Sequence, residues 1–231
     1  MREAVDQTVA ANGIVDGYVR PVAWRGSEMM GVSAQATRIN VAISAWDWPS
    51  YFSPEALMKG IRLKTSKWRR PSPETEPVHA KAAGLYMICT MSKHEAEAVG
   101  YDDALMLDWK GRVAEGTGAN IFVMFGDGKI VTPPPECFLN GITRQTVMKL
   151  AQIRGYEVIE RHMEPEELAR AEEIFVTGTA AEVTPVGRID DLNFSVGPIT
   201  KTLRANYEAL VGRPYQETSG QETGEDAISA P

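Results

Sequence analysis

The segment Val78-His79-Ala80-Lys81-Ala82-Ala83-Gly84-Leu85-Tyr86 decides the fold of this chain, and Glu115-Gly116-Thr117-Gly118-Ala119-Asn120 follows it about thirty residues later. The small residues around Lys81 leave room for a flat ring, and the glycines after Glu115 let the backbone approach a ligand closely. One amine, the phenol of Tyr86 and one carboxylate are the side chains that a Schiff base of pyridoxal phosphate needs. The two segments therefore predict a site for that cofactor.

Two further segments extend this pattern, Gly141-Ile142-Thr143 and Thr177-Gly178-Thr179-Ala180-Ala181-Glu182. With them, the chain closely resembles the class IV aminotransferases, the group that contains the branched-chain amino acid aminotransferases. The resemblance runs over nearly the whole chain. It implies an α/β (α+β) fold of fold type IV, with a large C-terminal domain and the remainder of a smaller N-terminal domain. It also implies pyridoxal 5′-phosphate as the cofactor.

The predicted domain organisation has four regions. They are the remainder of the small domain over residues 1–45, an interdomain linker over 46–58, the large cofactor-binding domain over 59–216, and a disordered tail over 217–231. The last region is mostly Ser, Gly, Glu, Asp, Thr and Ala, which bury too little apolar surface to offset the entropy lost on ordering.

The apolar periodicity and the Gly and Pro positions predict alternating helices and strands. Helices are expected over residues 1–12, 82–99, 143–154, 165–170 and 198–211. Strands are expected over residues 17–24, 39–46, 62–68, 103–108, 112–114, 120–125, 129–132, 157–162, 174–177 and 182–189. Asp127-Gly128 is the strongest hairpin signal in the chain.

Composition narrows the class of protein. The net charge of −7 argues against a nucleic-acid surface, and the one basic cluster, Lys67 to Arg70, is expected to be a solvated loop. Cys89 and Cys137 lack zinc or disulfide spacing, so we expect buried free thiols and no metal site. The first twenty residues have no apolar run of signal-peptide length, and no stretch approaches a membrane span, so we expect a cytoplasmic protein.

Lys81 is the predicted catalytic residue. A pyridoxal enzyme needs an amine that carries the cofactor and later acts as a base at the substrate Cα. Burial in a dry pocket would favour the neutral amine. Taken alone, a lysine is more often a solvated surface residue, and the resemblance reverses that expectation.

Glu115 would face the pyridine nitrogen, as the resemblance implies. A carboxylate about 4 Å from a protonated ring nitrogen, at an effective dielectric constant near 20, contributes roughly 4 kcal/mol. Before desolvation is subtracted, that attraction could raise the pKa of the ring nitrogen by up to roughly three units. The alternative is a glutamate that accepts hydrogen bonds in a turn.

The phosphate would bind where a loop enters the helix expected over residues 143–154, because a helix start offers unpaired N–H groups. The resemblance implies Ile142 and Thr143 there, with a second hydroxyl from Thr179, and places the hydroxyl of Tyr86 at the cofactor's ring oxygen. Taken alone, Thr143 would be an ordinary N-cap and Tyr86 a core residue. The implied cofactor-binding set is Lys81, Tyr86, Glu115, Gly118, Leu139, Ile142, Thr143, Gly178 and Thr179.

The substrate pocket follows from the same resemblance. Tyr18 and Arg20 lie on a strand that faces the substrate side chain, and the guanidinium can bind a second carboxylate bidentately. Trp48 and Tyr51 match the aromatic wall, and Val32 matches a residue contributed across a dimer interface. Taken alone, each would be an ordinary aromatic residue or strand charge. The implied substrate-binding set is Tyr18, Arg20, Val32, Trp48, Tyr51, Thr179 and Ala180.

We therefore expect a branched-chain amino acid aminotransferase that transfers the amino group of L-leucine, L-isoleucine or L-valine to 2-oxoglutarate, as a homodimer or higher homo-oligomer. The alternatives are a D-amino acid aminotransferase, an aminodeoxychorismate lyase of the same fold, or a truncated chain that binds the cofactor without turnover. The last follows because the sequence starts where the family's smaller domain is already under way. That start lacks an arginine used on the cofactor phosphate and a tyrosine of the substrate pocket, and Arg144 need not point inward to replace the arginine.

Overall fold

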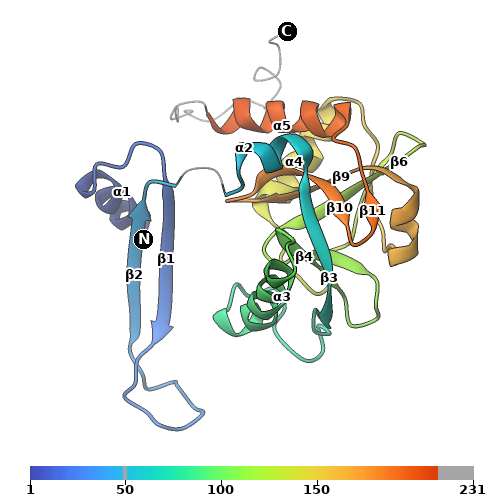
Figure 1. The fold of residues 1–231 in the computed structure, drawn as a ribbon. Coiled ribbons are helices and arrows are strands. Elements are labelled where there is room, and N and C mark those ends of the chain that lie inside the picture. The colour runs from blue at the N-terminus through green and yellow to red at the C-terminus, as the bar shows by residue number, and fades with distance from the viewer. Residues whose placement is uncertain (49–50, 213–231) are drawn as a thin grey trace. The chain divides into compact units, whose positions relative to one another are not determined.

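The computed structural model describes residues 1–48 and 51–212, and it divides the chain into two compact units, Met1–Tyr51 and Phe52–Pro231 (Figure 1). The division falls inside the linker predicted over residues 46–58, while the domain assignment itself stays a prediction. The tail predicted over residues 217–231 lies outside the described residues. None of the described helices is long and apolar enough to cross a membrane.

The first unit is a helix followed by a two-stranded antiparallel sheet. Helix α1 spans Arg2–Ala11, and strands β1 (Tyr18–Arg25) and β2 (Ile39–Trp46) pair in register from Tyr18 with Trp46 to Arg25 with Ile39 (Figure 1). Gly13, with a φ of 63°, takes the left-handed conformation just after α1, as expected for a residue without a Cβ. The elements predicted in this region are confirmed.

The second unit is built on a nine-stranded sheet. Its strands are β3 (Ile61–Arg69), β4 (Asp103–Leu107), β5 (Val113–Gly116), β6 (Asn120–Phe125), β7 (Ile130–Thr132), β8 (Val158–Glu160), β9 (Ala171–Gly178), β10 (Glu182–Ile189) and β11 (Leu192–Asn193). Pairing runs from β3 through β4 and β5 to β6, then to β9, β10 and back to β3, so these strands close into a barrel. Closure removes the unpaired edges of those strands.

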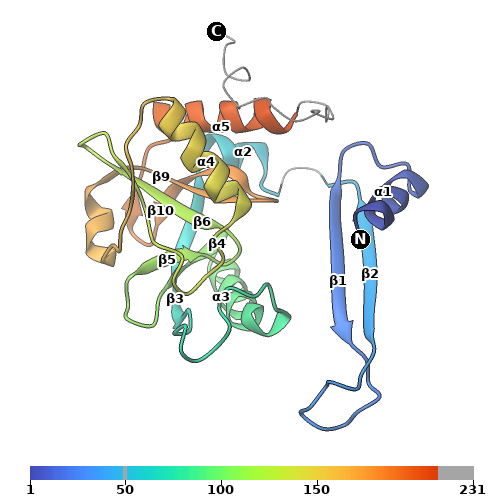
Figure 2. The same cartoon turned by 180° about the vertical axis from the view of Figure 1, so that it is seen from behind.

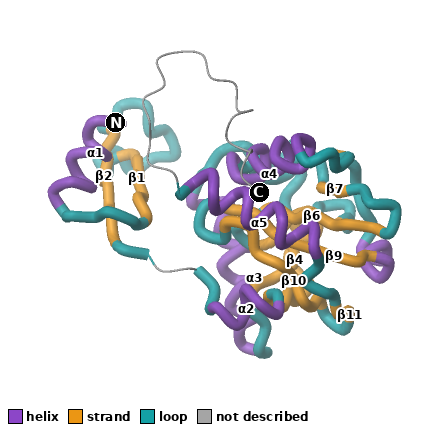
Figure 3. The backbone as a smooth tube through the Cα atoms, turned by 90° about the horizontal axis from the view of Figure 1, so that it is seen from above, coloured by secondary structure: helices purple, strands orange, loops and turns teal. Residues whose placement is uncertain are grey.

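Side chains alternate between two apolar clusters along the barrel strands. On β6, Ile121 and Val123 join one cluster with Leu63 and Val176, while Phe122 and Met124 join a second one. The second cluster is completed by α4 (Ile142–Ile153) and α5 (Pro198–Val211), which lie beside one another over the sheet (Figures 2 and 3). The second cluster therefore packs α4 and α5 against the barrel.

The remaining helices are α2 (Pro54–Lys59), the 3-10 turn η1 (Ala83–Tyr86), α3 (Met87–Ala98) and the 3-10 turn η2 (Pro165–Arg170). The helix predicted over residues 82–99 is thus two pieces, because its first turn is wound as a 3-10 helix. Helix α2 was assigned to the linker by the sequence, although Ser53 Oγ accepts a hydrogen bond from the Ala56 N–H as an N-cap.

The prediction that residues 67–70 form a solvated loop is wrong. Strand β3 continues through Arg69, and the next residue, Arg70, is only 5% exposed. The expectation of buried free thiols is confirmed for Cys89 and Cys137.

Candidate active site

A cavity of about 510 Å³ in the second unit is lined by loops and by the elements that they join. The predicted cofactor residues all lie along it: Lys81, Tyr86, Glu115, Gly118, Leu139, Ile142, Thr143, Gly178 and Thr179. Segments that are far apart in the sequence therefore meet at one place, while the roles of these residues stay predictions.

The strand register explains why these loops meet. Asn120, the first residue of β6, pairs with Glu115 on β5 and with Thr177 on β9. The turn after Glu115 and the turn after β9 therefore start side by side. A Cβ at Gly178 would lie 3.2 Å from the Gly118 carbonyl oxygen, so the two turns pack with little space for a side chain.

Lys81 lies just before the 3-10 turn. Its Nζ donates a hydrogen bond of 3.0 Å to the hydroxyl of Tyr86, which places the amine and the phenol in contact. The side chain of Lys81 is exposed, so the dry surroundings expected from the sequence are not found in the second unit taken by itself. The amine is accessible to an aldehyde from the cavity.

Glu115 is a buried ionisable residue of the site, with its side chain 10% exposed. Its Oε1 lies 3.3 Å from Nε of Arg70, and its Oε2 accepts a hydrogen bond of 3.3 Å from Nδ2 of Asn120. Burial raises the pKa of the Glu115 carboxyl to about 8, although the nearby charges of Arg70 and Lys81 act in the opposite direction. A second buried carboxylate, Asp103, contributes to this rise of the Glu115 pKa.

The start of α4 forms another part of the wall. Gly141 is the N-cap and Ile142 the first helical residue, so Thr143 is not the N-cap that it would be taken for alone. Because Gly141 has no side chain to cap the helix, the first N–H groups of α4 are suited to an anion. A Cβ at Gly141 would lie 2.5 Å from Oδ1 of Asn120, so a larger residue here would require the Asn120 side chain to move.

Hydroxyl groups add to the same wall. Thr143 Oγ1 lies 3.5 Å from the Tyr207 hydroxyl, and Thr179 also lines the cavity. Thr177 Oγ1 is buried and has no hydrogen-bond partner among the described residues. An amine, a phenol and a carboxylate, together with a helix start and free hydroxyl capacity, fit a flat, phosphate-bearing aldehyde such as pyridoxal phosphate.

The predicted substrate residues lie mostly in the first unit. Tyr18, Trp46 and Trp48 form an aromatic cluster with ring centroids 5.3–5.5 Å apart, and Trp48 stacks on Tyr51 at 6.2 Å. The guanidinium of Arg20 lies 5.6 Å from the ring centroids of Tyr18 and Trp46. The arrangement is a cation held against aromatic faces.

The other predicted substrate residues, Val32, Thr179 and Ala180, are divided between the two units. Val32 is fully exposed, Thr179 lines the cavity of the second unit, and Ala180 is not among the residues lining that cavity. That the side chains of the first unit reach the substrate stays a prediction.

Sequence reasoning missed several residues that line the cavity, among them Arg70, His79 and Asn120. Arg70 belongs to the basic cluster that was expected to be solvated, and in the structure it directly follows β3. Asn120 closes the Glu-Gly-Thr-Gly-Ala-Asn motif, and His79 stands two residues before Lys81, so proximity to the motifs was the available signal.

Arg144 is buried but donates to Asn140, Pro133 and Glu160. It does not line this cavity.

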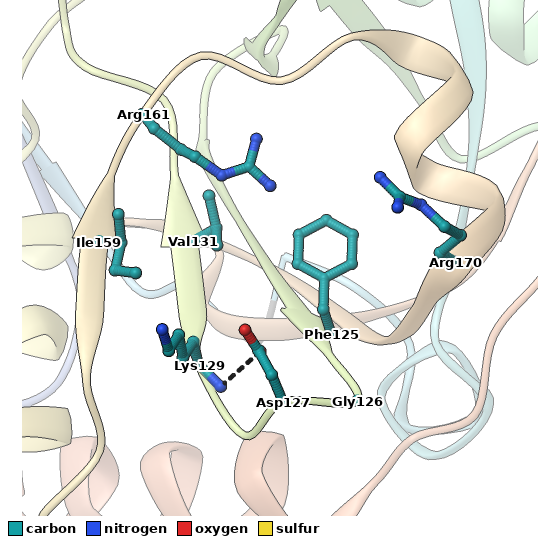
Figure 4. Close-up of a pocket in the computed structure, with 8 residues that line it drawn as sticks. All are labelled: Phe125, Gly126, Asp127, Lys129, Val131, Ile159, Arg161 and Arg170. Carbon is teal, nitrogen blue, oxygen red and sulfur yellow. Dashed lines mark hydrogen bonds between the residues drawn. The ribbon is translucent and has the colours of Figure 1, made fainter.

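A second cavity, of about 490 Å³, lies between the β6–β7 hairpin and η2. Figure 4 shows Arg161 and Arg170 extending toward one another across Phe125, with Lys129 near the hairpin. Both arginines pair with the carboxylate of Glu167, and Lys129 pairs with Glu157. The charges of this cavity are therefore balanced locally, and the first cavity is the stronger candidate for a reaction site.

Comparison with known proteins gives one consistent result. The family model described as amino-transferase class IV matches residues 1–189. The branched-chain-amino-acid aminotransferase of Pseudomonas aeruginosa is 40% identical over 214 residues, covering 91% of this chain and 69% of that protein. The Escherichia coli K12 enzyme of the same name is 37% identical over 215 residues, with the same coverage.

Solved structures agree. A T.th. branched-chain amino acid aminotransferase with pyridoxamine 5′-phosphate superposes with a TM-score of 0.86 at 41% identity, covering 92% of this chain and 71% of that chain. The same enzyme complexed with N-(5′-phosphopyridoxyl)-L-glutamate gives a TM-score of 0.85 at 40% identity, covering 92% of this chain and 70% of that chain.

Proposed function

The chain belongs to the class IV aminotransferases, and we propose that it is a branched-chain amino acid aminotransferase with pyridoxal 5′-phosphate as its cofactor. It would transfer the amino group of L-leucine, L-isoleucine or L-valine to 2-oxoglutarate. The observation that carries this proposal is the meeting of the Lys81–Tyr86 pair, Glu115 and the start of α4 on one cavity.

When bound, pyridoxal phosphate supplies an electron-withdrawing ring that stabilises negative charge at the substrate Cα. Lys81 would hold the cofactor through Nζ and, once released by the substrate, move a proton between the substrate Cα and the cofactor's C4′. The Tyr86 hydroxyl, 3.0 Å from Nζ, would orient the amine and contact the ring oxygen. A single flexible side chain thereby serves both binding and proton transfer.

Glu115 and the helix start would fix the two ends of the cofactor. A positive charge on the ring nitrogen would favour ionisation of Glu115, and the resulting carboxylate would in turn keep that nitrogen protonated, because adjacent opposite charges stabilise one another. The N–H groups of Ile142 and Thr143 and the Thr179 hydroxyl would bind the phosphate, with Gly118, Leu139 and Gly178 shaping the cavity around the ring.

Substrate choice would rest on the first unit. In this proposal Tyr18, Trp48 and Tyr51 form the apolar wall for the branched side chain, and Arg20 binds the distal carboxylate of 2-oxoglutarate or glutamate. The remaining assignments are the substrate carboxylate at Thr179 and Ala180, and a contribution of Val32 across a dimer interface. We further assign the protein to the cytoplasm, as a homodimer or higher homo-oligomer.

The experiment is an absorbance titration of the purified chain with pyridoxal phosphate, followed by addition of L-leucine. Binding to Lys81 should give a new visible band, and L-leucine should convert it to the pyridoxamine form. Lys81→Ala is the control and should give neither change. A band that responds to D-alanine and not to L-leucine would contradict the branched-chain assignment, and no band at all would contradict the cofactor assignment.

A further inference from the structure

The carboxylate of Glu115 is held from both sides, by Arg70 and by Asn120. Oε1 lies 3.3 Å from Nε of Arg70, and Oε2 accepts a hydrogen bond of 3.3 Å from Nδ2 of Asn120. We propose that Arg70 and Asn120 are positioning residues that favour the ionised form of Glu115 and aim it at the ring nitrogen of the cofactor. The role of Glu115 toward the cofactor rests on the proposed function. The effect of Arg70 and Asn120 on the ionisation of Glu115 does not, because it is a property of the cofactor-free chain.

Arg70 is fixed by its surroundings. Its Nε donates to the Cys137 carbonyl at 3.2 Å, and its Nη1 donates to the Leu85 carbonyl at 3.2 Å and to the Cys89 sulfur at 3.1 Å. The residue is 5% exposed, so water contributes little to its solvation. The planar guanidinium fork holds a positive charge beside the carboxylate.

Asn120 fixes the second oxygen. Its Nδ2 donates both to Glu115 and, at 3.1 Å, to the Leu139 carbonyl, so the amide group is oriented by two acceptors. The Cys137 and Leu139 carbonyls belong to the same segment, which leads into α4. Arg70 and Asn120 therefore tie Glu115 to the segment that also sets the start of α4.

The electrostatic need for Arg70 follows from burial. A carboxyl in a dry cavity favours its neutral form, and a neutral acid would not stabilise a protonated ring nitrogen. Of the charged groups around Glu115, Arg70 lowers its pKa most, Lys81 lowers it as well, and Asp103 raises it. The thiols of Cys89 and Cys137 are kept neutral because burial raises the pKa of both. Arg70 is thus the fixed cation, since Lys81 would change its charge when it binds the cofactor.

The first test uses the cofactor-free chain with Glu115 labelled at the side-chain carboxyl carbon and titrated by NMR. Arg70→Gln should raise the titration midpoint of Glu115 by about 1–3 units, the usual effect of an adjacent opposite charge. Arg70→Lys, which keeps a charge, should recover part of that shift. Arg69→Gln, at the exposed neighbouring position, is the matched control and should leave the midpoint unchanged.

An unchanged midpoint in folded Arg70→Gln would overturn the inference, and Arg70→Met, which is also neutral, serves the same comparison if the glutamine variant does not fold. The measurement requires neither cofactor nor turnover, so its failure is separate from failure of the proposed function.

A second test uses the loaded enzyme. The acidic limb of the pH–kcat profile of Arg70→Gln should move to higher pH, and Asn120→Ala should lower kcat with little change in KM. A loss of activity without movement of the acidic limb would mean that Arg70 is only structural.

Discussion

The free energy of unfolding of the cofactor-free chain should fall, relative to that of Glu115→Gln, as the pH rises from about 4.5 to about 8. Burial raises the pKa of Glu115 from 4.5 to about 8 in the folded chain. In that range the folded chain holds a proton that the unfolded chain has released. Stability is therefore fully present below the unfolded pKa and is lost as the pH rises through the folded one.

The size of the effect follows from the same shift. A rise from 4.5 to about 8, at about 1.36 kcal/mol per unit, corresponds to a ceiling of about 5 kcal/mol across the range. Glutamine keeps the shape of the side chain but cannot ionise. The substitution also changes the free energy of unfolding by a constant amount, because an amide now faces Arg70. That amount cancels when only the change of the free energy with pH is compared.

The assay is urea unfolding of the unsubstituted chain and of Glu115→Gln at pH 5, 6, 7 and 8 without cofactor. Glu172→Gln is the matched control, because that carboxylate is exposed, and its curve should run parallel to that of the unsubstituted chain. Parallel curves for Glu115→Gln as well would refute the reasoning, since they would show that Glu115 titrates alike in the folded and unfolded states.

Single contacts give three further predictions. Tyr86→Phe removes the hydroxyl that accepts from Lys81 at 3.0 Å, so kcat should fall about 5- to 10-fold, measured with L-leucine, and an unchanged kcat would contradict the orienting role. Gly141→Ala would place a Cβ 2.5 Å from Asn120 Oδ1, and its affinity for pyridoxal phosphate should drop at least about tenfold by absorbance titration; unaltered affinity would argue against phosphate binding there. Glu173 accepts hydrogen bonds from the backbone N–H groups of Ile199 and Thr200 at the start of α5. Glu173→Gln weakens this cap, so the free energy of unfolding should fall by about 1–2 kcal/mol. A change within the error of the measurement would exclude this cap as a stabilising contact.

Local patterns predicted most of the secondary structure. The strands at residues 39–46 and 182–189 and the helix at 198–211 have the predicted bounds, because their apolar spacing and flanking residues are local signals. Helix α2 was missed because six residues after an aromatic, proline-containing segment give too short a pattern. The closure of the barrel was not predicted, since it depends on β9 pairing with both β6 and β10.

The chemical groups proposed for the site, and their order along the chain, could be read from the amino-acid sequence. Lys81, Tyr86, Glu115 and the Gly141-Ile142-Thr143 turn could be recognised because each stands in a short segment whose small residues and spacing are local properties. The surroundings of Glu115, in contrast, depend on how distant segments fold together. Arg70 looks like one more surface charge in the sequence, and it becomes a buried partner because β3, the 3-10 turn and the segment before α4 meet around it. Burial and charge pairing depend on which distant segments exclude water together, and no local pattern encodes that exclusion.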